Sequence, residues 1–233
     1  DHGVVKSGKE AQVELVERIG DDGRSCLLAR KRNLPRHVTQ KGQLEAMGVQ
    51  RASTIRHDVQ YREGRQFRKS RDRRAIERMS SYGKQLLQSR WTGTEHDVMS
   101  RLWDAGVSVP YPVAYADDVF DLEYVGSWEQ AAPQLSAARL APDELASAFE
   151  QLVVGLRAIT AAGVAHGDLS AYYLLWWDDR LWFIDFPQSV DIAANLQGVD
   201  FLHRDVLNVA QWFGQRGVDV DGEELFADLL SFL

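Results

Sequence analysis

Cysteine is nearly absent from this sequence: 233 residues contain one, Cys26. A single cysteine excludes an intrachain disulfide framework and a zinc site built from several thiolates, and it favours a reducing, cytoplasmic location. Cys26 falls in an apolar stretch that is typical of a strand, so we expect it to be a buried structural thiol.

Long hydrophobic runs are missing as well. No apolar stretch approaches the roughly 18 residues that a bilayer-spanning helix needs, and the first ten residues lack the pattern of a secretory signal. We therefore expect no membrane partner. The sequence begins without methionine, which suggests that an N-terminal extension is missing.

The composition that is present is that of an ordinary globular protein, with 45% hydrophobic residues. The formal charge of −7 is unevenly distributed. Arg62–Arg90 contains ten Lys or Arg against three acidic residues, a net charge of +7 that leaves −14 on the remainder. This basic segment is a solvated helical surface, a surface for an anionic partner, or a mobile loop over the phosphates of a nucleotide.

Hydrophobic patterning predicts an α+β protein. A Gly-Asp-Asp-Gly turn at residues 20–23 joins two apolar, β-branched stretches, as in a hairpin. A polar stretch from Leu34 to about Ser89 shows no long apolar period, and we expect irregular structure there. The predicted strands are Val4–Glu17, Ser25–Arg32, two around a turn at Asp117 and Asp118, and a short hairpin inside Val164–Asp191. The predicted helices are Trp91–Ala105, Ala141–Ala162, Asp200–Phe213 and one that starts at Gly222. The first would have Val98, Leu102 and Ala105 on one face and would end at Gly106.

This order of elements predicts two lobes within a single domain that covers residues 1–233. Residues 1 to about 125 would form a small β-rich N-lobe, and residues from about 126 to 233 would form a reduced helical C-lobe. We expect the linker between them near Gly126–Gln134.

Two aspartates carry the clearest chemical signal. Asp168 stands in "HGDLS" and Asp185 stands in "FIDF", at the two ends of the predicted short hairpin. Phosphoryl transfer needs one carboxylate near the acceptor's proton and another that holds Mg²⁺ against the phosphate oxygens. The alternative is that both are ordinary turn aspartates, because the H-G-D triplet alone is a weak signal.

Other segments of the chain, in the order that a kinase domain has them, make the assignment to a family more specific than the H-G-D triplet does. Six segments resemble sequences of the RIO family of atypical serine/threonine protein kinases and ATPases. They are "KSGKEAQVELVE" from Lys6, "LARK" up to Lys31, "WTGTEHDVMSRLWDAGVSVPYP" around Glu95, "HGDLS", "IDFPQSVD" and "FLHRDVLNVAQWF". The resemblance covers nearly the whole chain. The basic segment and "DFPQSVD" are most similar to the first RIO subtype.

The resemblance implies a two-lobed kinase-like fold that binds ATP with Mg²⁺ or Mn²⁺. It makes Asp168 the catalytic base and Asp185 the metal ligand, which in the ATPase mode is itself transiently phosphorylated. Lys31, paired with Glu95, would contact the α and β phosphates. The remaining nucleotide-binding residues that it implies are Ser7, Gly8, Lys9, Glu10 and Ala11 of a phosphate loop, Val13 after it, and Glu123, Tyr124 and Val125, up to Gly126, for adenine.

Tyr173 departs from the family pattern. Five positions after the aspartate of H-G-D the family carries an asparagine that binds metal, whereas a neutral tyrosine, with its pKa near 10, is a poor ligand for Mg²⁺. We expect Asp185 to hold one metal and phosphoryl transfer to be impaired. A register shift between Tyr172 and Tyr173 is the alternative.

Two residues are expected to support the site. His166 is predicted to pack in the lower lobe and hydrogen-bond to backbone, because no second histidine lies at metal-ligand spacing. Asp205 resembles the buried aspartate with which kinases accept N–H groups from the catalytic loop.

Three functions remain open from the sequence. The chain is a serine/threonine kinase or ATPase that acts on a protein or on itself, a nucleotide-binding pseudokinase that acts as an assembly factor, or a phosphotransferase for small molecules such as aminoglycosides or choline. The resemblance also implies a contact between Arg62–Arg90 and ribosomal RNA or a pre-ribosome.

Overall fold

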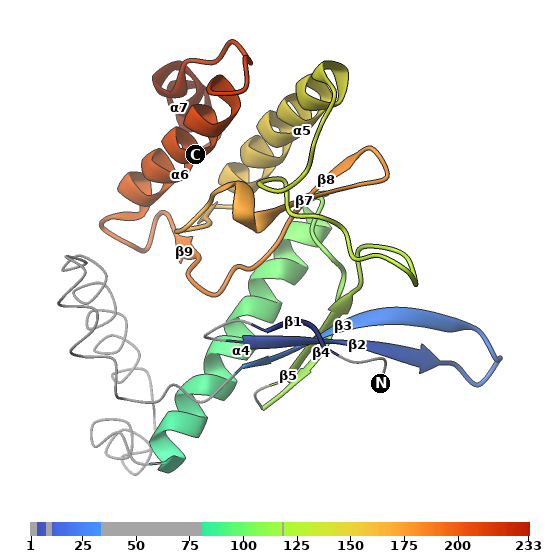
Figure 1. The fold of residues 1–233 in the computed structure, drawn as a ribbon. Helices are drawn as coiled ribbons and strands as arrows, with labels where there is room; N and C mark the ends of the chain where they lie inside the picture. Colours follow the sequence, from blue (N-terminus) through green and yellow to red (C-terminus); the bar gives the residue numbers. More distant parts are fainter. Residues whose placement is uncertain (1–3, 8–10, 34–80, 118) are drawn as a thin grey trace, which may run out of the picture.

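The computed structural model describes residues 4–7, 11–33, 81–117 and 119–233. It shows the two-lobed α+β arrangement that the sequence predicts, with a β-sheet and one long helix below and a group of helices above (Figure 1). Two short pairs of antiparallel strands, β6–β9 and the hairpin β7–β8, lie between the sheet and the upper helices.

The N-terminal sheet is antiparallel and has the strand order β1-β2-β3-β5-β4 within the described ranges. Its strands are β1 (Val4–Ser7), β2 (Ala11–Ile19), β3 (Ser25–Asn33), β4 (Pro112–Ala116) and β5 (Val119–Glu123). The β2–β3 hairpin is confirmed, and Gly23 closes its turn at a φ of 76°, which favours glycine. The β4–β5 pair is confirmed too.

A single strand over Val4–Glu17 is a wrong prediction. Ser7 of β1 faces Gln12 of β2 in an antiparallel register, so the chain reverses between Ser7 and Ala11. The alternating apolar pattern continues on both sides of this reversal, and periodicity alone therefore does not reveal it.

The prediction of a buried Cys26 is also wrong, because its side chain is exposed. Cys26 faces Arg18 at the far end of the β2–β3 ribbon. The neighbouring strand β5 pairs with β3 only from Leu28 onward. Two strands alone bury little on either face, and Cys26 lies on that unsupported part.

Helix α4 (Ser81–Asp104) begins ten residues before the predicted start, so the irregular structure expected up to Ser89 is wrong for its last part. The face that is buried carries Glu95, Met99 and Leu102, which recur at helical spacing. Ala105 lies beyond the helix and is exposed, contrary to prediction. Residues 34–80, with most of the basic segment, lie outside the described residues.

The upper lobe contains the other three predicted helices. They are α5 (Pro142–Ala161), α6 (Gly198–Gly214) and α7 (Gly222–Leu230). Pro142 occupies the first turn of α5, where a missing N–H costs nothing, and the side chain of Glu144 accepts a hydrogen bond from the Ala141 N–H at 2.7 Å. Gly163 follows the helix at a φ of 70°.

The short hairpin predicted between the two aspartates is present as β7 (Leu174–Trp177) and β8 (Arg180–Phe183). Its turn residues, Asp178 and Asp179, have φ values of 52° and 54°, the backbone conformation of a two-residue hairpin loop. The 3₁₀ turn η2 (Ala171–Tyr173) leads into β7, and the strands β6 (Val164–Ala165) and β9 (Val190–Asp191) pair nearby.

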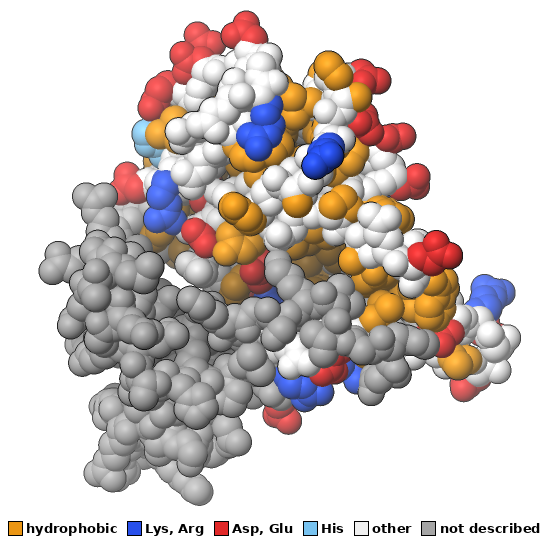
Figure 2. All heavy atoms as spheres, viewed as in Figure 1, with side chains coloured by type: hydrophobic (Ala, Val, Ile, Leu, Met, Phe, Trp, Pro, Cys, Tyr) orange, Lys and Arg blue, Asp and Glu red, His pale blue; other side chains and the backbone are white. Residues whose placement is uncertain are grey.

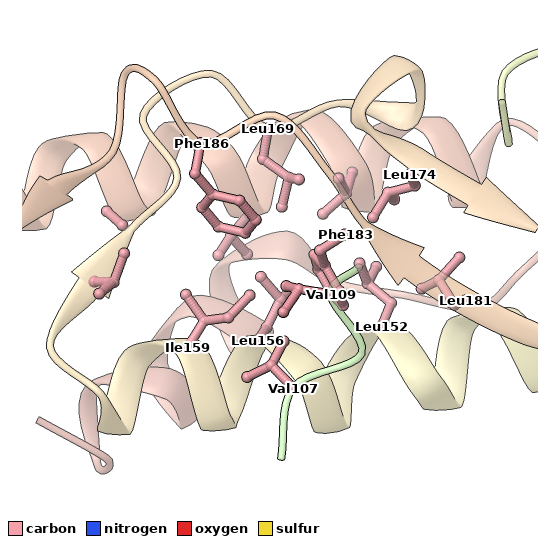
Figure 3. Packing of buried hydrophobic residues seen from close by; sticks show 14 of the residues in the cluster. Val107, Val109, Leu152, Leu156, Ile159, Leu169, Leu174, Leu181, Phe183 and Phe186 are labelled. Carbon is pink, nitrogen blue, oxygen red and sulfur yellow. The ribbon is translucent and has the colours of Figure 1, made fainter. Parts of the chain in front are cut away.

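The hydrophobic core of the upper lobe holds both aspartate-bearing segments in place. Leu169, which follows Asp168, and Phe186, which follows Asp185, are almost fully buried. Figure 3 shows both side chains directed toward the core above α5, next to Phe183 of β8. Each aspartate therefore stands next to an anchored apolar side chain, which fixes the backbone from which its carboxylate projects.

Gly155 of α5 is the point of closest approach in this core. A Cβ there would lie 2.4 Å from the ring of Phe183, which is itself 1% exposed and has no space to move away. We predict that Gly155→Val lowers the free energy of unfolding by about 1–3 kcal/mol through overpacking. Urea denaturation monitored by tryptophan fluorescence measures this change. The neighbouring Val154 is 66% exposed, and Val154→Ala should stay within about 0.5 kcal/mol of the unaltered chain. Equal stability of the Gly155 variant would contradict the packing described.

Candidate active site

Lys31 links the two lobes. Its ammonium group donates to both carboxylate oxygens of Glu95 on α4, at 2.8 and 3.0 Å, and to Oδ1 of Asp185 after β8, at 2.5 Å. The Lys31–Glu95 ion pair that the sequence predicts is therefore present, and it is extended by a second carboxylate. Three elements far apart in the chain meet at one cation.

Burial makes these charges interdependent. Removal from water lowers the pKa of Lys31, but the carboxylates of Glu95 and Asp185 outweigh it and raise that pKa above its ordinary value. Lys31 therefore stays protonated throughout the neutral range. Burial raises the pKa of Glu95, and Asp185 adds to the rise, while Lys31 opposes it. Glu95 is 2% exposed and depends on Lys31 for its compensation.

Asp185 has an unusual backbone. Its φ of 69° lies in the left-handed region, which aspartate tolerates better than most residues. The next residue, Phe186, donates its backbone N–H to Oε1 of Glu95 at 3.2 Å. Glu95 thus holds both Lys31 and the turn that carries Asp185. Backbone strain of this kind is concentrated at functional sites.

The loop that carries Asp168 is held from α6. Asp205, 1% exposed, accepts hydrogen bonds from the backbone N–H groups of Gly167 at 2.7 Å and of Leu169 at 2.9 Å, as predicted. Gly167 has a φ of 85°, and a Cβ there would lie 2.4 Å from the carbonyl oxygen of Gln188. The glycine of H-G-D is thus required by the backbone conformation.

His166 connects the two aspartate segments. Its Nε2 is 3.1 Å from the carbonyl oxygen of Ile184, so the ring donates there, and this agrees with the predicted backbone contact. Its ring centroid lies 5.4 Å from that of Tyr173 and 4.6 Å from that of Phe186. This position is structural, between the loop before β7 and the turn after β8.

Two supporting residues were missed by the sequence reasoning. Arg204 donates to the carbonyl oxygen of Gly167, and Asn208 donates to that of Leu169 at 3.2 Å. Both lie on α6 beside Asp205, and Arg204 and Asn208 are four residues apart, so they share a helix face. That spacing was the signal available in the sequence.

Tyr173 lies beside Asp168. Its hydroxyl donates to Oδ2 of Asp168 at 3.1 Å. The backbone fixes its place, because Tyr173 accepts from the Ile184 N–H at 3.0 Å and donates to the Ser170 carbonyl at 2.9 Å. Asp168 and Asp185 thus emerge at the same end of the β7–β8 hairpin.

The predicted nucleotide-binding segments are described in part. Val13 faces Lys31 across β2 and β3, so the two lie side by side in the sheet. Ser7 ends β1 and Ala11 begins β2, whereas Gly8, Lys9 and Glu10 lie outside the described residues.

In the segment predicted to bind adenine, residues 123–126, two backbone N–H groups already donate hydrogen bonds within the protein. Glu123 donates to the Tyr111 carbonyl at 2.9 Å, and Tyr124 donates to the Leu27 carbonyl at 3.3 Å. Val125 is buried beside Trp182. The chain then turns at Gly126, where φ is 144° and a Cβ would lie 2.6 Å from the Gln130 carbonyl oxygen.

One of the described carboxylates, that of Asp185, is suited to binding a divalent cation together with a nucleotide. Within the described ranges, no three His, Cys, Asp or Glu side chains converge to form a metal site by themselves. Magnesium, however, is commonly bound by one or two carboxylates together with substrate phosphates and water. Asp185 suits this role, and the Tyr173 hydroxyl, which donates to Asp168, does not.

A separate hollow of about 550 Å³ lies between the first part of α5 and the last part of α6. Its wall includes Leu145, Phe149 and Trp212, and hydrophobic side chains fill this region in Figure 2. None of the predicted site residues lines it.

Comparison with known proteins gives the same family as the sequence motifs. The RIO domain model matches residues 38–225. The chain belongs to the RIO family. The RIO match begins after Lys31, so the role predicted for Lys31 rests on its contacts and its motif, and the role predicted for the phosphate loop rests on the motif alone.

Several curated RIO kinases are similar to this chain. The RIO-type serine/threonine-protein kinase Rio1 of Haloferax volcanii is 36% identical over 136 residues, which are 58% of this chain and 46% of that protein. The protein of the same name from Thermoplasma acidophilum is 30% identical over 58% of this chain and 69% of its own length. The serine/threonine-protein kinase RIO3 of Mus musculus is 29% identical over 66% of this chain and 30% of its length.

These alignments establish the family and leave the subtype open, because both Rio1 and RIO3 proteins match. The chain spans less than half of the Haloferax protein's length. Among helices in the described ranges, none has both the length and the apolar composition to cross a membrane.

The buried charge cluster gives a prediction that is independent of catalysis. Lys31→Met leaves Glu95 buried without its cation, and we expect a loss of about 3–5 kcal/mol in unfolding free energy. Adding Glu95→Gln to that variant should restore part of this loss, because no uncompensated charge then remains in the interior. Urea denaturation of the two single variants and the double variant gives the coupling energy.

The matched control is Arg32→Met on the same strand. The Arg32 side chain is 42% exposed and lies 4.0 Å from Glu14, so its loss should cost less than about 1 kcal/mol. Strictly additive effects of Lys31→Met and Glu95→Gln would contradict the buried ion pair.

Proposed function

We propose that this chain is an ATP-dependent RIO-type serine/threonine kinase or ATPase, whose site lies where the two lobes meet. The observation that carries the proposal is the contact of Lys31 with both Glu95 and Asp185. A buried lysine held by one carboxylate, beside a second carboxylate at the end of a hairpin, is suited to placing a triphosphate between a cation and a metal ligand.

The nucleotide would lie between the sheet and the β7–β8 hairpin. Lys31 contacts the α and β phosphates, and the predicted phosphate loop, residues 7–11, is the proposed second partner of the phosphate chain. Val13, beside Lys31, covers the nucleotide from the sheet. The N–H groups of Glu123 and Tyr124 and the carbonyl of Val125 already have backbone partners, so we propose that adenine contacts the Val125 N–H and the other carbonyls of this segment.

Asp168 is the proposed base. It accepts the proton of an acceptor hydroxyl as the bond to the γ phosphorus forms or, in the ATPase mode, the proton of the water that releases the phosphate from Asp185. Asp185 would hold Mg²⁺ or Mn²⁺, which supplies neutralisation of charge on the phosphate oxygens when bound. In the ATPase mode Asp185 itself receives the phosphate transiently. Asp205, Arg204 and Asn208 keep the Asp168 loop in place.

A second candidate, nucleotide binding without turnover, is favoured by one observation. The Tyr173 hydroxyl donates to Asp168, so the proposed base is already engaged. Tyr173 also replaces a carboxamide that would add a second metal ligand. A chain of this kind would act through its nucleotide-bound shape, as an assembly factor.

We also propose an anionic partner and a cytoplasmic location. The net charge of +7 over Arg62–Arg90 supports an anionic partner, and ribosomal RNA is the one we propose. The protein acceptor is another chain or this chain itself. A cytoplasmic location agrees with a single cysteine.

ATP turnover in the presence of Mg²⁺ or Mn²⁺ tests the enzyme. We expect the unaltered chain to hydrolyse ATP, and Asp185→Ala to lower the rate roughly 100-fold or more, since several kcal/mol of charge stabilisation are lost. Tyr173→Asn should raise the rate by freeing Asp168 and adding a metal ligand. Phosphate release and transfer of labelled phosphate to protein are the measurements.

Asp228→Ala serves as the matched control. This carboxylate pairs with Arg157 between α5 and α7, away from the charge cluster, and its loss should leave turnover unchanged. ATP binding without turnover, together with turnover in Tyr173→Asn, would select the second candidate. Turnover that survives Asp185→Ala would remove Asp185 from the site.

A further inference from the structure

The hydroxyl of Tyr173 occupies the place where a phosphate acceptor is needed. It donates to Oδ2 of Asp168 at 3.1 Å, which is within the 2.6–3.2 Å range over which a base takes a proton. Among the described side chains, the hydroxyl that hydrogen-bonds to Asp168 is that of Tyr173. In the proposed reaction the group in this position is the acceptor.

We propose that Tyr173 is itself a phosphate acceptor, modified by its own chain with the γ phosphate of a nucleoside triphosphate. The inference rests on the proposed function, because it uses the same Asp168 and the same nucleotide. It goes beyond that function by naming the residue, a tyrosine of the catalytic loop, that receives the phosphate.

The reaction balances with the nucleotide alone. The phenolic oxygen of Tyr173 forms a bond to the γ phosphorus, and the bond from that phosphorus to the bridging oxygen breaks. The nucleoside diphosphate leaves with the electron pair of the broken bond, and the phenolic proton passes to the Asp168 carboxylate. No oxidant, reductant or further reactant is required.

The chain holds this hydroxyl in position before any nucleotide binds. Tyr173 ends the η2 turn, its backbone bonds to Ser170 and Ile184, and its ring contacts that of His166. An acceptor fixed in this way needs no encounter with a second molecule, which removes much of the entropic barrier. Its neighbour Tyr172 is 63% exposed.

Phosphorylation would then act on the site itself. A phosphotyrosine adds about 1.5 to 2 negative charges at neutral pH. That charge would stand beside Asp168 and near Asp185, where a second triphosphate must bind. Like charges in close contact repel one another, so the modified chain should bind nucleotide weakly. Transfer of a phosphate to Tyr173 would therefore slow the later turnover of ATP by the same chain.

Mass spectrometry of the chain after incubation with Mg-ATP is the first test. We expect phosphotyrosine at position 173, formed at a rate per molecule that does not change when the protein is diluted tenfold. Tyr173→Phe should lose this phosphate, and Tyr172→Phe should keep it at the same rate. Asp168→Asn should slow its formation by roughly 100-fold.

Nucleotide affinity gives a second readout that does not depend on turnover. Calorimetric titration with a non-hydrolysable ATP analogue and Mg²⁺ should show binding to the unmodified chain. Binding to the chain phosphorylated at Tyr173 should be at least about tenfold weaker, because of the added negative charge. Equal affinities of the two forms would overturn the inhibitory role of the phosphate.

The position of the phosphate and the binding of ATP separate the proposed function from the phosphorylation of Tyr173. Binding and turnover of ATP with phosphate on any other residue, or on none, overturn the inference and leave the proposed function standing. Faster turnover in Tyr173→Phe with no phosphotyrosine in the unaltered chain also overturns it, because the hydroxyl then only blocks the base. No ATP binding by any variant overturns both.

Discussion

The contact of one ammonium group with two carboxylates determines how this protein is organised. Lys31 comes from the sheet, Glu95 from the long helix α4, and Asp185 from the turn after β8, so the cluster joins both lobes at one point. The carboxylate of Glu95 is buried, so it needs the ammonium group of Lys31 nearby. It also accepts a hydrogen bond from the backbone N–H of Phe186, which fixes the turn that carries Asp185. Removing any one of the three charges therefore disturbs the geometry of the other two.

Support for the second aspartate is built differently. Asp168 projects from a loop whose backbone is held by Asp205 and Arg204 of α6, while Leu169 anchors the same loop in the core. Hydrogen bonds from α6 and apolar packing in the core therefore hold the backbone on both sides of Asp168. Such preorganisation is what phosphoryl transfer requires from a protein, because its catalysis depends mostly on positioning and on charge.

Much of this could be predicted from the sequence, and the failures have physical causes. Helices α5 and α6 carry strong apolar periods, and their ends fall within about two residues of the prediction. Periodicity does not show a reversal such as that between β1 and β2, nor how far a neighbouring strand covers Cys26. The sequence motifs single out Asp168, Asp185 and Tyr173 as candidate site residues. They do not predict the hydrogen bond between Tyr173 and Asp168, because that bond depends on tertiary geometry.

The most direct test of the central claim is a crystal structure of this chain with Mn²⁺ and a non-hydrolysable ATP analogue. The account predicts an anomalous manganese signal within coordination distance of Asp185, with the α and β phosphates against Lys31 and the γ phosphate facing Tyr173. A nucleotide seated elsewhere, for example in the hollow between α5 and α6, or phosphates out of reach of Lys31, would contradict it.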